Sequence, residues 1–519
     1  MAPLMDDRPS QPQDCVPRFL VVGAGSRGNA YARGLTESGL GVVAAVAEPV
    51  EFKRRQLGRR YIWRADEPVP EQEFDDWRDY LSFEQQRRED ERAGKSVSPG
   101  IDAVFICIQD NQHVHAVTAL APLGLHVLCE KPLATTFHDC LSIQKAIETG
   151  PKSLFAIGHV LRYSPHNMML RHLVREKKAI GDVISLEHTE PIGWWHFSHS
   201  YVRGYWRKEA TSAPSLLTKS CHDIDFIMWM MCSPLDHNTE QPHLPSTISS
   251  SGSLKQFRRP QKPKAAGDAT NCMSCPLQES CQYSAKRIYF DRHLAKGKAL
   301  APKTFWPIDI ITPAVESLVM NDKPEEAKTE LYKSLSEDYS KSTPVQDIES
   351  RPWFGRCVWE SDNDVVDDQV VTFTWDDTEE GRGAKSAIFH MIAPTLAQCD
   401  RRGWIYGSTG EISYDSKTIT VHDFTKDETE VFSPKIPVNS HHGGGDVGIV
   451  QQFAKAIMAV HGKELSVAQA QREYIGADAE EIIRSHAAVF AAEEARRDQK
   501  VVHWSRWWQD NAASVLAKE

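Results

Sequence analysis

The sequence lacks the features that would place the chain in a membrane or on a nucleic acid. No uninterrupted apolar run approaches the roughly 20 residues that a membrane-spanning helix needs. Acidic residues outnumber basic ones, 71 to 60, so the net charge of −11 offers no positive excess for a phosphate backbone. We therefore expect a protein that binds neither membranes nor nucleic acids.

The N-terminal segment lacks the apolar core of a signal peptide. Residues 1–18 are polar and contain proline, so we expect a disordered tail and a cytoplasmic protein. The 11 cysteines are odd in number and scattered, which does not indicate a disulfide framework. A length of 519 residues exceeds one ordinary core and indicates two domains with insertions.

A glycine-rich turn after an apolar strand is the most informative local pattern. Residues 19–22 (FLVV) lead into Gly23-x-Gly25-x-x-Gly28, in which Ser26 and Arg27 fill the last two variable positions. The glycines allow a tight turn, close approach of a pyrophosphate and close packing of the helix that follows. The N-terminus of that helix offers free N–H donors to phosphate. The pattern predicts a dinucleotide site.

An acidic residue follows the second predicted strand, residues 42–47. Glu48 lies 20 residues after Gly28, where a carboxylate can accept hydrogen bonds from ribose hydroxyls. It would also repel a 2′-phosphate, which favours NAD over NADP. The neighbouring Lys53, Arg54 and Arg55 leave the choice open, since they could serve a phosphate or form a solvated helix face.

Polar residues also follow the next two predicted strands. Asn111 and His113 come after the strand at 101–108, and Glu130-Lys131-Pro132 comes after the strand at 126–129. The carboxyl ends of parallel strands meet at one edge of a sheet, where such folds bind ligands. Pro132 makes the turn rigid and could take a cis bond, and Lys131 is predicted to face the crevice.

These motifs, with Arg162-Tyr163-x-Pro165, resemble the Gfo/Idh/MocA family of NAD(P)-dependent sugar and inositol dehydrogenases. The resemblance implies an α/β fold in which an N-terminal Rossmann parallel sheet (19–150) precedes a C-terminal α/β domain (151–507) with an open, mostly antiparallel sheet. It implies that Lys131 lies near nicotinamide and substrate. A sheet face of the second domain is a pairing surface in this family, which allows a homo-oligomer.

Two segments of the second domain supply candidate substrate and catalytic residues. Residues 193–206 are rich in aromatic side chains and histidine, typical of either a packed loop or a sugar platform; with Arg162, the candidate substrate contacts are His196, His199 and Arg203. The family commonly has aspartate four residues before its active-site histidine. Here Thr218 takes that place, followed by Lys219.

His222 remains at the predicted start of a helix, residues 224–231. A helix N-terminus keeps imidazole neutral, which suits a general base, although His222 could instead be a helix cap. Alternatively Lys131 is the base, if burial and Lys219 lower its pKa.

An insertion is predicted at about 239–351, with loop at 246–267. It carries Cys272-x-x-Cys275 and Cys281, which resemble part of a zinc site, but no nearby histidine completes a tetrahedron. A distant fourth ligand is the alternative, and we assign no metal site. Beyond the insertion, alternating segments predict strands at 370–375, 387–392, 403–406, 411–414 and 418–422, and Asp446 suits the N-cap of a helix at 447–460.

The combined patterns predict a dehydrogenase that transfers a hydride between NAD and a CH–OH carbon of a carbohydrate or polyol. Two alternatives stay open. One is a redox-neutral NAD-dependent glycosidase, which the large aromatic second domain would suit. The other is a non-catalytic NAD-binding regulatory protein, which the loss of the usual aspartate at Thr218 would suit.

Overall fold

The chain divides into two compact units in the computed structural model, which describes residues 16–235, 240–300, 305–437 and 442–513. Most of the tail predicted at 1–18 lies outside the described residues. The first unit comprises residues up to Leu133, Ser142–Val160 and Gly444–Ile482, and the second comprises the rest. The sheet predicted for 19–150 is thus joined by a late segment of the chain.

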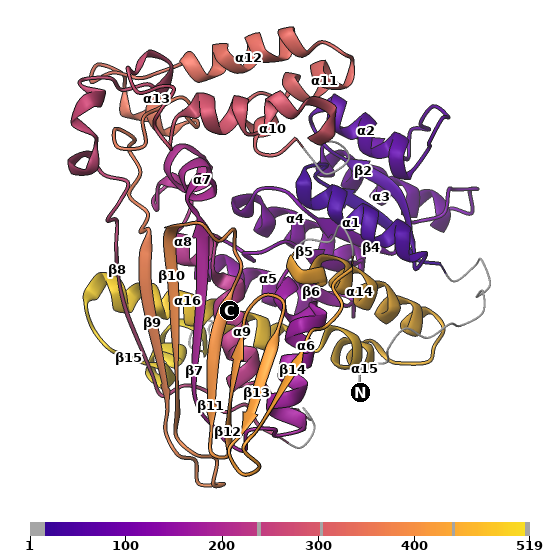
Figure 1. The fold of residues 1–519 in the computed structure, drawn as a ribbon. Helices are drawn as coiled ribbons and strands as arrows, with labels where there is room; N and C mark the ends of the chain where they lie inside the picture. Colours follow the sequence, from indigo (N-terminus) through magenta and orange to yellow (C-terminus); the bar gives the residue numbers. More distant parts are fainter. Residues whose placement is uncertain (1–15, 236–239, 301–304, 438–441, 514–519) are drawn as a thin grey trace. The chain divides into compact units, whose positions relative to one another are not determined.

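The first unit contains a six-stranded parallel sheet in the order β3-β2-β1-β4-β5-β6 (Figure 1). Its strands are β1 (Arg18–Val22), β2 (Val42–Ala47), β3 (Glu73–Phe74), β4 (Ala103–Ile106), β5 (His126–Cys129) and β6 (Phe155–Ile157). Its helices include α1 (Ser26–Ser38), α2 (Glu51–Tyr61), α3 (Trp77–Arg92), α4 (His113–Leu120), α14 (Gly445–His461) and α15 (Val467–Ala470). The order of the strands reverses between β1 and β4, and this is the switch point where such sheets bind nucleotides.

The second unit contains a nine-stranded sheet in the order β14-β13-β12-β11-β7-β10-β9-β8-β15. The strands are β7 (Val183–Gly193), β8 (Thr247–Ser253), β9 (Asp368–Trp375), β10 (Lys385–Thr395), β11 (Arg402–Gly407), β12 (Gly410–Tyr414), β13 (Ile419–Asp423), β14 (Glu428–Phe432) and β15 (Val502–His503). Neighbours are antiparallel except for the parallel pair β7–β10. The predicted two-domain α/β fold class is confirmed.

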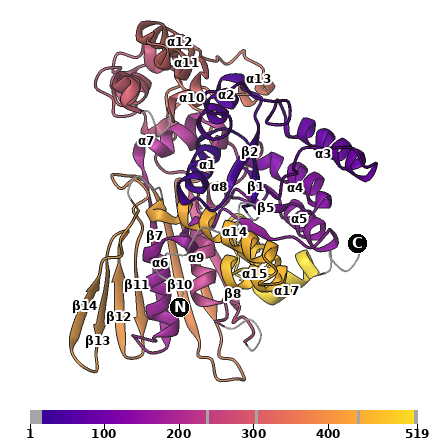
Figure 2. The same cartoon turned by 90° about the vertical axis from the view of Figure 1, so that its right-hand side faces the viewer.

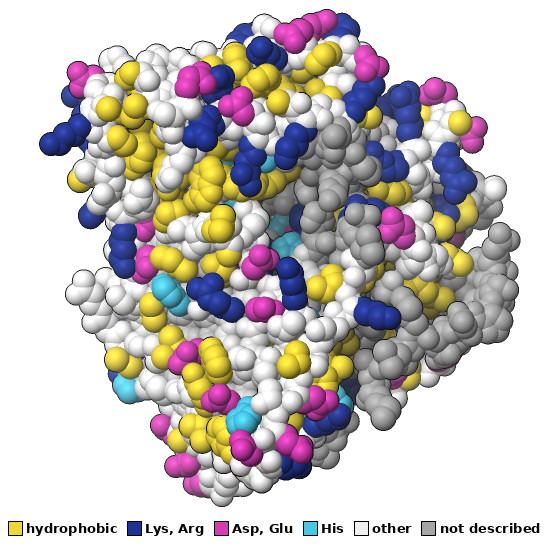
Figure 3. All heavy atoms as spheres, in the orientation of Figure 1, with side chains coloured by type: hydrophobic (Ala, Val, Ile, Leu, Met, Phe, Trp, Pro, Cys, Tyr) yellow, Lys and Arg dark blue, Asp and Glu magenta, His cyan; other side chains and the backbone are white. Residues whose placement is uncertain are grey.

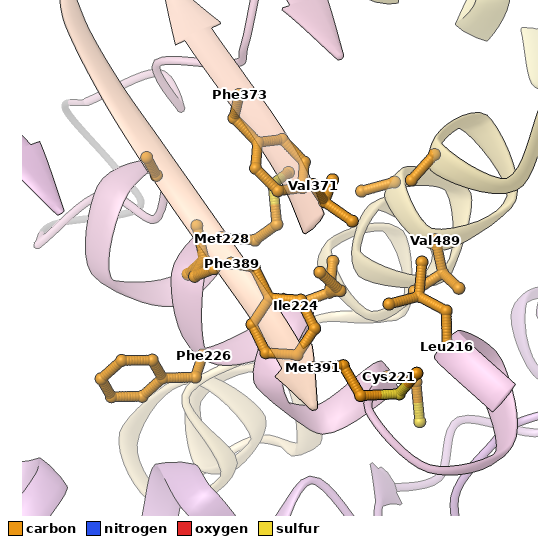
Figure 4. Packing of buried hydrophobic residues seen from close by; sticks show 14 of the residues in the cluster. Leu216, Cys221, Ile224, Phe226, Met228, Val371, Phe373, Phe389, Met391 and Val489 are labelled. Atoms are coloured by element: carbon orange, nitrogen blue, oxygen red, sulfur yellow. The ribbon is translucent and has the colours of Figure 1, made fainter. Parts of the chain in front are cut away.

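One face of this sheet is buried under helices. Side chains along β9 alternate between buried and partly exposed, as expected when one face is covered. Figures 1 and 2 show α9 (Cys221–Met231) along that face, and Figure 4 shows Ile224 of α9 among Val371, Phe389 and Val489. Val489 belongs to α16 (Ala479–Asp498), so two helices far apart in sequence close the same core.

Some elements differ from the sequence-based expectation. β8 lies within the segment predicted as loop, because its serine-rich sequence lacks apolar alternation and only its backbone pairing with β9 defines it. The aromatic segment forms a short helix, α7 (Trp194–Phe197), which continues as a π-helix over Ser198–Arg203. Helix α14 begins at Gly445, so Asp446 lies in the first turn and is not the N-cap.

The inserted segment has a small hydrophobic core of its own. It includes α10 (Ile308–Ile311), α11 (Ala314–Met320) and α12 (Pro324–Ser336), which lie near α7 at the top of Figure 1. On the face shown in Figure 3, acidic and basic side chains intermingle. No helix in the described ranges is long and apolar enough to span a bilayer.

A buried histidine makes the first unit sensitive to acid. His126 accepts a hydrogen bond at Nδ1 from the Leu154 N–H at 2.9 Å and is 7% exposed. Burial, with a smaller contribution from His461, lowers the pKa of His126 to about 4. The folded pKa is thus below the ordinary value of about 6.5, and the unfolded chain binds a proton that the folded chain excludes.

We therefore expect the free energy of unfolding to fall as pH decreases from about 6.5 to about 4. His126→Asn, which keeps an acceptor near Nδ1 but cannot become charged, should remove about 3 kcal/mol of this pH dependence. Urea unfolding of wild type and variant across this range measures the difference. An identical pH dependence in both proteins would contradict the assignment.

Candidate functional site

The three glycines of the turn between β1 and α1 have different structural roles. Gly23 has φ +95°, and a Cβ there would lie 2.5 Å from the carbonyl oxygen of Cys107; a Cβ on Gly28 would lie 1.9 Å from that of Gly23. A Cβ on Gly25 would meet nothing within 4 Å. The fold thus requires two of the glycines, while Gly25 borders open space. Because Gly25 is also the N-cap of α1, no side chain occupies the N–H donors that a pyrophosphate would use.

Glu48 ties this turn to the end of β2. Its Oε2 accepts the Ala24 N–H at 2.8 Å, and its Oε1 accepts the Val50 N–H at 2.9 Å. A carboxylate offers about four acceptor positions, so lone pairs remain for ribose hydroxyls. The structure adds a positioning role to the predicted cofactor contact.

The basic residues near Glu48 have acidic partners. Arg54 Nη2 lies 2.6 Å from Asp75 Oδ1, and Arg55 Nη2 lies 3.2 Å from Glu73 Oε1. These contacts favour interpreting the two arginines as parts of local ion pairs. They add no support for a site that binds a 2′-phosphate.

Arg27, in the first turn of α1, joins two carboxylates of the first unit. Its Nε donates to Glu130 Oε1 at 2.6 Å, and its two terminal nitrogens donate to Asp446 at 2.9 and 3.0 Å. Burial would raise the pKa of Glu130, but the charge of Arg27 and the hydrogen bonds from Tyr31 and Arg27 together outweigh burial and hold that pKa below its ordinary value. Glu130 therefore stays ionised. Neighbouring Ser26 is exposed.

The remaining predicted cofactor residues lie after β4 and β5. The ring of His113 lies between two carbonyl oxygens, with Nδ1 2.8 Å from Pro132 O and Nε2 3.2 Å from Ile108 O. It thereby joins the two turns, and Asn111 is exposed beside it. The Lys131–Pro132 peptide is cis, as the sequence analysis anticipated, and the Lys131 N–H donates to Glu130 Oε2 at 3.1 Å.

The second unit buries a cluster of charged side chains around His222. Glu190, on β7, accepts hydrogen bonds from Lys219 Nζ at 2.5 Å and from Arg401 Nη2 at 2.7 Å. Arg401 also donates to both oxygens of Asp223. The charges of the two carboxylates and the two cations thus balance, and none of the four side chains is more than 10% exposed.

This pairing defines the charge of Lys219. Burial alone would lower the pKa of Lys219, but nearby Cys399 and Glu190 outweigh burial and raise it above its ordinary value. Lys219 therefore remains protonated near neutral pH. It supplies positive charge and is unsuited to act as a base.

His222 is a neutral group inside this balanced cluster. Burial lowers the pKa of His222; Asp223 raises it and Arg401 lowers it, and the net pKa is below the ordinary 6.5. Nε2 lies 2.6 Å from Arg401 Nη2 and 3.2 Å from Asp223 Oδ2. Nδ1 is buried and has no hydrogen-bond partner among the described residues.

The contacts of Nε2 define two tautomers of His222. If Nε2–H donates to Asp223, Nδ1 carries a lone pair and can take a proton. If Nε2 accepts from Arg401, Nδ1 carries the proton and can donate a hydrogen bond. In both tautomers Nδ1 is the ring atom left for a ligand.

Comparison with known proteins identifies the first unit. A family model described as "Oxidoreductase family, NAD-binding Rossmann fold" matches residues 17–158. Residues 17–158 thus match the Gfo/Idh/MocA oxidoreductase family. The Gfo/Idh/MocA match ends within the first unit, before β7 and the cluster around His222 begin.

Curated relatives match stretches of similar length. Inositol 2-dehydrogenase 2 of Saccharopolyspora erythraea is 30% identical over 132 residues, 25% of this chain and 35% of that protein. The 2,7-anhydro-N-acetylneuraminate hydratase of Escherichia coli is 27% identical over 131 residues, 25% of this chain and 34% of that protein. The chain spans about a third of the length of these relatives.

Solved structures extend the likeness of fold to both units. A levoglucosan dehydrogenase in complex with NADH and levoglucosan has a TM-score of 0.57 at 14% identity, covering 94% of this chain and 98% of that one. A myo-inositol dehydrogenase, described as putative, from Sinorhizobium meliloti has a TM-score of 0.53 at 13% identity, covering 94% and 99%. At these identities the likeness shows the fold alone.

The predicted substrate residues have partners other than His222. Arg162 forms a two-point ion pair with Asp225, both bonds 2.7 Å. His199 stacks on Phe354 of the inserted segment, with ring centroids 5.1 Å apart, and His196 Nδ1 contacts Gln398. Arg203 is fully buried against backbone carbonyls. Their role in binding substrate stays a prediction.

Sequence reasoning missed Glu190, Asp223, Arg401 and Asp446. Asp223 is adjacent to His222 in the sequence, and this adjacency could have indicated that the two side chains interact. Glu190 lies on β7 at a fully buried position, where an unpaired acid would be costly. Arg401 is separated from Glu190 by 211 residues, and only the sheet brings them together.

Alanine substitutions at two glycines test the predicted pyrophosphate site. We expect Gly25→Ala to leave the melting temperature unchanged, because its Cβ meets nothing, and to weaken NADH binding at least 10-fold by filling the space beside the turn. Gly383→Ala, also in open space but in the second unit, is the matched control. Fluorescence titration with NADH measures both, and unchanged affinity in Gly25→Ala would contradict a pyrophosphate site here.

Arg401 yields a test of the charge balance. Because Arg401 lowers the pKa of His222, Arg401→Gln should raise that pKa, while Arg401→Lys should leave it close to wild type. Nuclear magnetic resonance titration of the His222 ring measures the change. An unchanged or lower pKa in Arg401→Gln would contradict the proposed electrostatics.

Proposed function

We propose that the protein is an NAD-dependent oxidoreductase that transfers a hydride between NAD and a carbinol carbon of a sugar, a sugar derivative or a cyclic polyol. The Gfo/Idh/MocA domain and the names of its relatives support the cofactor and the reaction class. One observation carries the assignment of the catalytic group. It is the buried Nδ1 of a neutral His222, which has no hydrogen-bond partner among the described residues.

The residues of the first unit would hold the cofactor. The turn at Gly25 and the N-terminus of α1 would bind the pyrophosphate, and Glu48 would accept hydrogen bonds from the ribose. When bound, NAD supplies the hydride acceptor. The contacts of Arg54 and Arg55 with acids favour NAD over NADP in this proposal.

A residue of the second unit would accept the proton of the substrate hydroxyl. With Nε2–H donated to Asp223, Nδ1 of His222 would take the hydroxyl proton as the alcohol is oxidised. The imidazolium so formed would be stabilised by Asp223 and Glu190, 3.2 and 3.9 Å from Nε2. Lys131, which the family resemblance places near nicotinamide and substrate, would polarise the substrate oxygen.

A redox-neutral reaction is the second candidate. The hydratase from Escherichia coli among the relatives is named for addition of water, which favours considering this reaction. Such an enzyme would retain NADH and release none in the steady state. A screen of sugars and polyols for NADH absorbance and for products formed without it separates the two.

The proposal includes pairing of two copies through the outer face of the nine-stranded sheet. Large apolar side chains on three strands are exposed there, by 39 to 60%: Ile388, Trp404 and Val431. Solvent-exposed apolar residues grouped on a sheet face are typical of an interaction surface.

Separate substitutions test the catalytic assignment. His222→Gln and Lys131→Met should each slow single-turnover hydride transfer to bound NAD by about 100-fold or more, since each would remove a proton-handling or charge-stabilising group. His172→Gln, an exposed histidine paired with Glu176, is the control and should retain the wild-type rate. A variant that transfers hydride at the wild-type rate removes its residue from the mechanism.

A further inference from the structure

Four cysteines of the second unit come together although they are far apart in sequence. Asn271 and Arg356 form an antiparallel bridge, and the next residue of each strand is a cysteine. The Cys272 N–H donates to Gly355 O and the Cys357 N–H donates to Thr270 O, both at 2.8 Å. The fold thus adds Cys357 to the three cysteines that the sequence groups as Cys272, Cys275 and Cys281.

The sulfur of Cys275 accepts a backbone hydrogen bond. The Leu277 N–H, two residues after the cysteine, donates to Cys275 Sγ at 3.4 Å. Such a bond stabilises a thiolate and orients it, as do the outer-shell contacts of metal ligands.

The sulfur of Cys272 contacts the buried guanidinium of Arg203. Arg203 Nη2 lies 3.2 Å from Cys272 Sγ and donates to Tyr283 O at 2.7 Å, while Nε donates to Arg356 O at 2.6 Å. The side chain is fully buried, and its Nη1 has no hydrogen-bond partner among the described residues. No carboxylate of the described chain forms an ion pair with Arg203.

A buried guanidinium without a carboxylate needs another source of negative charge. Four neutral thiols would not supply it. Four thiolates around a core of charge +2 carry a net charge of −2, which would compensate Arg203 within the protein. Cys272 Sγ lies 3.9 Å from the carbonyl oxygen of Tyr283, two residues after Cys281, and the Cys275 N–H donates to Cys272 O at 3.3 Å, so the segments that carry these three cysteines adjoin.

We propose that Cys272, Cys275, Cys281 and Cys357 are the ligands of a four-thiolate metal centre that ties the inserted segment to the sheet of the second unit. This site is separate from the proposed reaction around His222 and does not depend on it. Tyr283 and Trp359 bury its surroundings, as suits a closed site with no open coordination position.

The spacing of the sulfurs indicates the occupant. A single zinc ion with Zn–S bonds of about 2.3 Å would hold its sulfurs about 3.8 Å apart. Among the described residues only Glu190, His222 and Asp223 bring three candidate ligand atoms within 4.8 Å of one another, so no three of the cysteine sulfurs lie as close together as one zinc ion would hold them. Thiolates at the corners of an iron–sulfur cube lie farther apart than those on one ion, so the site is assigned to a [4Fe–4S] cluster.

The test is the metal and sulfide content of the full-length chain, purified without oxygen from iron-supplied cells. We expect about four iron and four acid-labile sulfide per chain in wild type. Cys275→Ser and Cys357→Ser should lose most of both, and Cys232→Ser, at a buried cysteine next to Met228, should keep them. Cys275 is only partly buried, so Cys275→Ser should keep its circular dichroism spectrum and elution volume.

Each alternative outcome leads to a definite conclusion. One zinc per chain, lost in both ligand variants, would retain the four ligands and overturn the iron–sulfur assignment. Wild type with neither metal after anaerobic purification would overturn the site. A folded Cys275→Ser protein with the full wild-type metal content would also overturn it.

Discussion

The burial of four compensating charges around one histidine is the constraint on which the second unit depends. Glu190, Lys219, Asp223 and Arg401 would each be costly to bury alone, and together they sum to zero. The strand register makes this possible. Arg402 on β11 pairs with Thr189 on β7, so Arg401 and Glu190 follow at adjoining positions. A slip of one residue would displace Arg401, leave Asp223 without a cation and change the pKa of His222.

Charge pairing has a comparable role in the first unit. Arg27 starts the helix after the glycine turn and holds Asp446, which arrives more than 400 residues later in the chain. The late segment Gly444–Ile482 is thereby fixed to the glycine turn, and Phe453 of this segment also packs against Phe19. Both units thus use an arginine to join distant parts of the chain. Arg203 is a third such arginine, and its partners are sulfur and carbonyl groups.

Local patterns predicted the parts of the fold that are local in origin. The strand ending at Val22, the glycine turn and the strands from β9 to β13 have clear apolar periods, and their positions agree within a few residues. β8 was not predicted because Ile248 is its only fully buried apolar side chain, and one such residue gives no alternating pattern. Its position depends on backbone pairing with β9, which no local pattern reports.

The same distinction applies to the sites. His222 and Lys219 were predicted because they stand in one short motif, and the structure brings them into one cluster. Arg401 and Cys357 were not predicted, because each stands alone in the sequence and belongs to no motif with a recognisable spacing. Arg203 was predicted to contact substrate from its aromatic neighbours, whereas its buried contacts are with the cysteine strands. Tertiary pairing over 80 to more than 200 residues was the missing information.

The most direct measurement of the central claim follows the hydride itself. Sugars and cyclic polyols deuterated at their carbinol carbons are incubated with the protein and NAD, and the nicotinamide is analysed by mass spectrometry after rapid quenching. Our account predicts deuterium on the reduced cofactor with at least one substrate, whether the cofactor is released or retained. Cofactor that binds to the protein but acquires no deuterium from any of these substrates would contradict it.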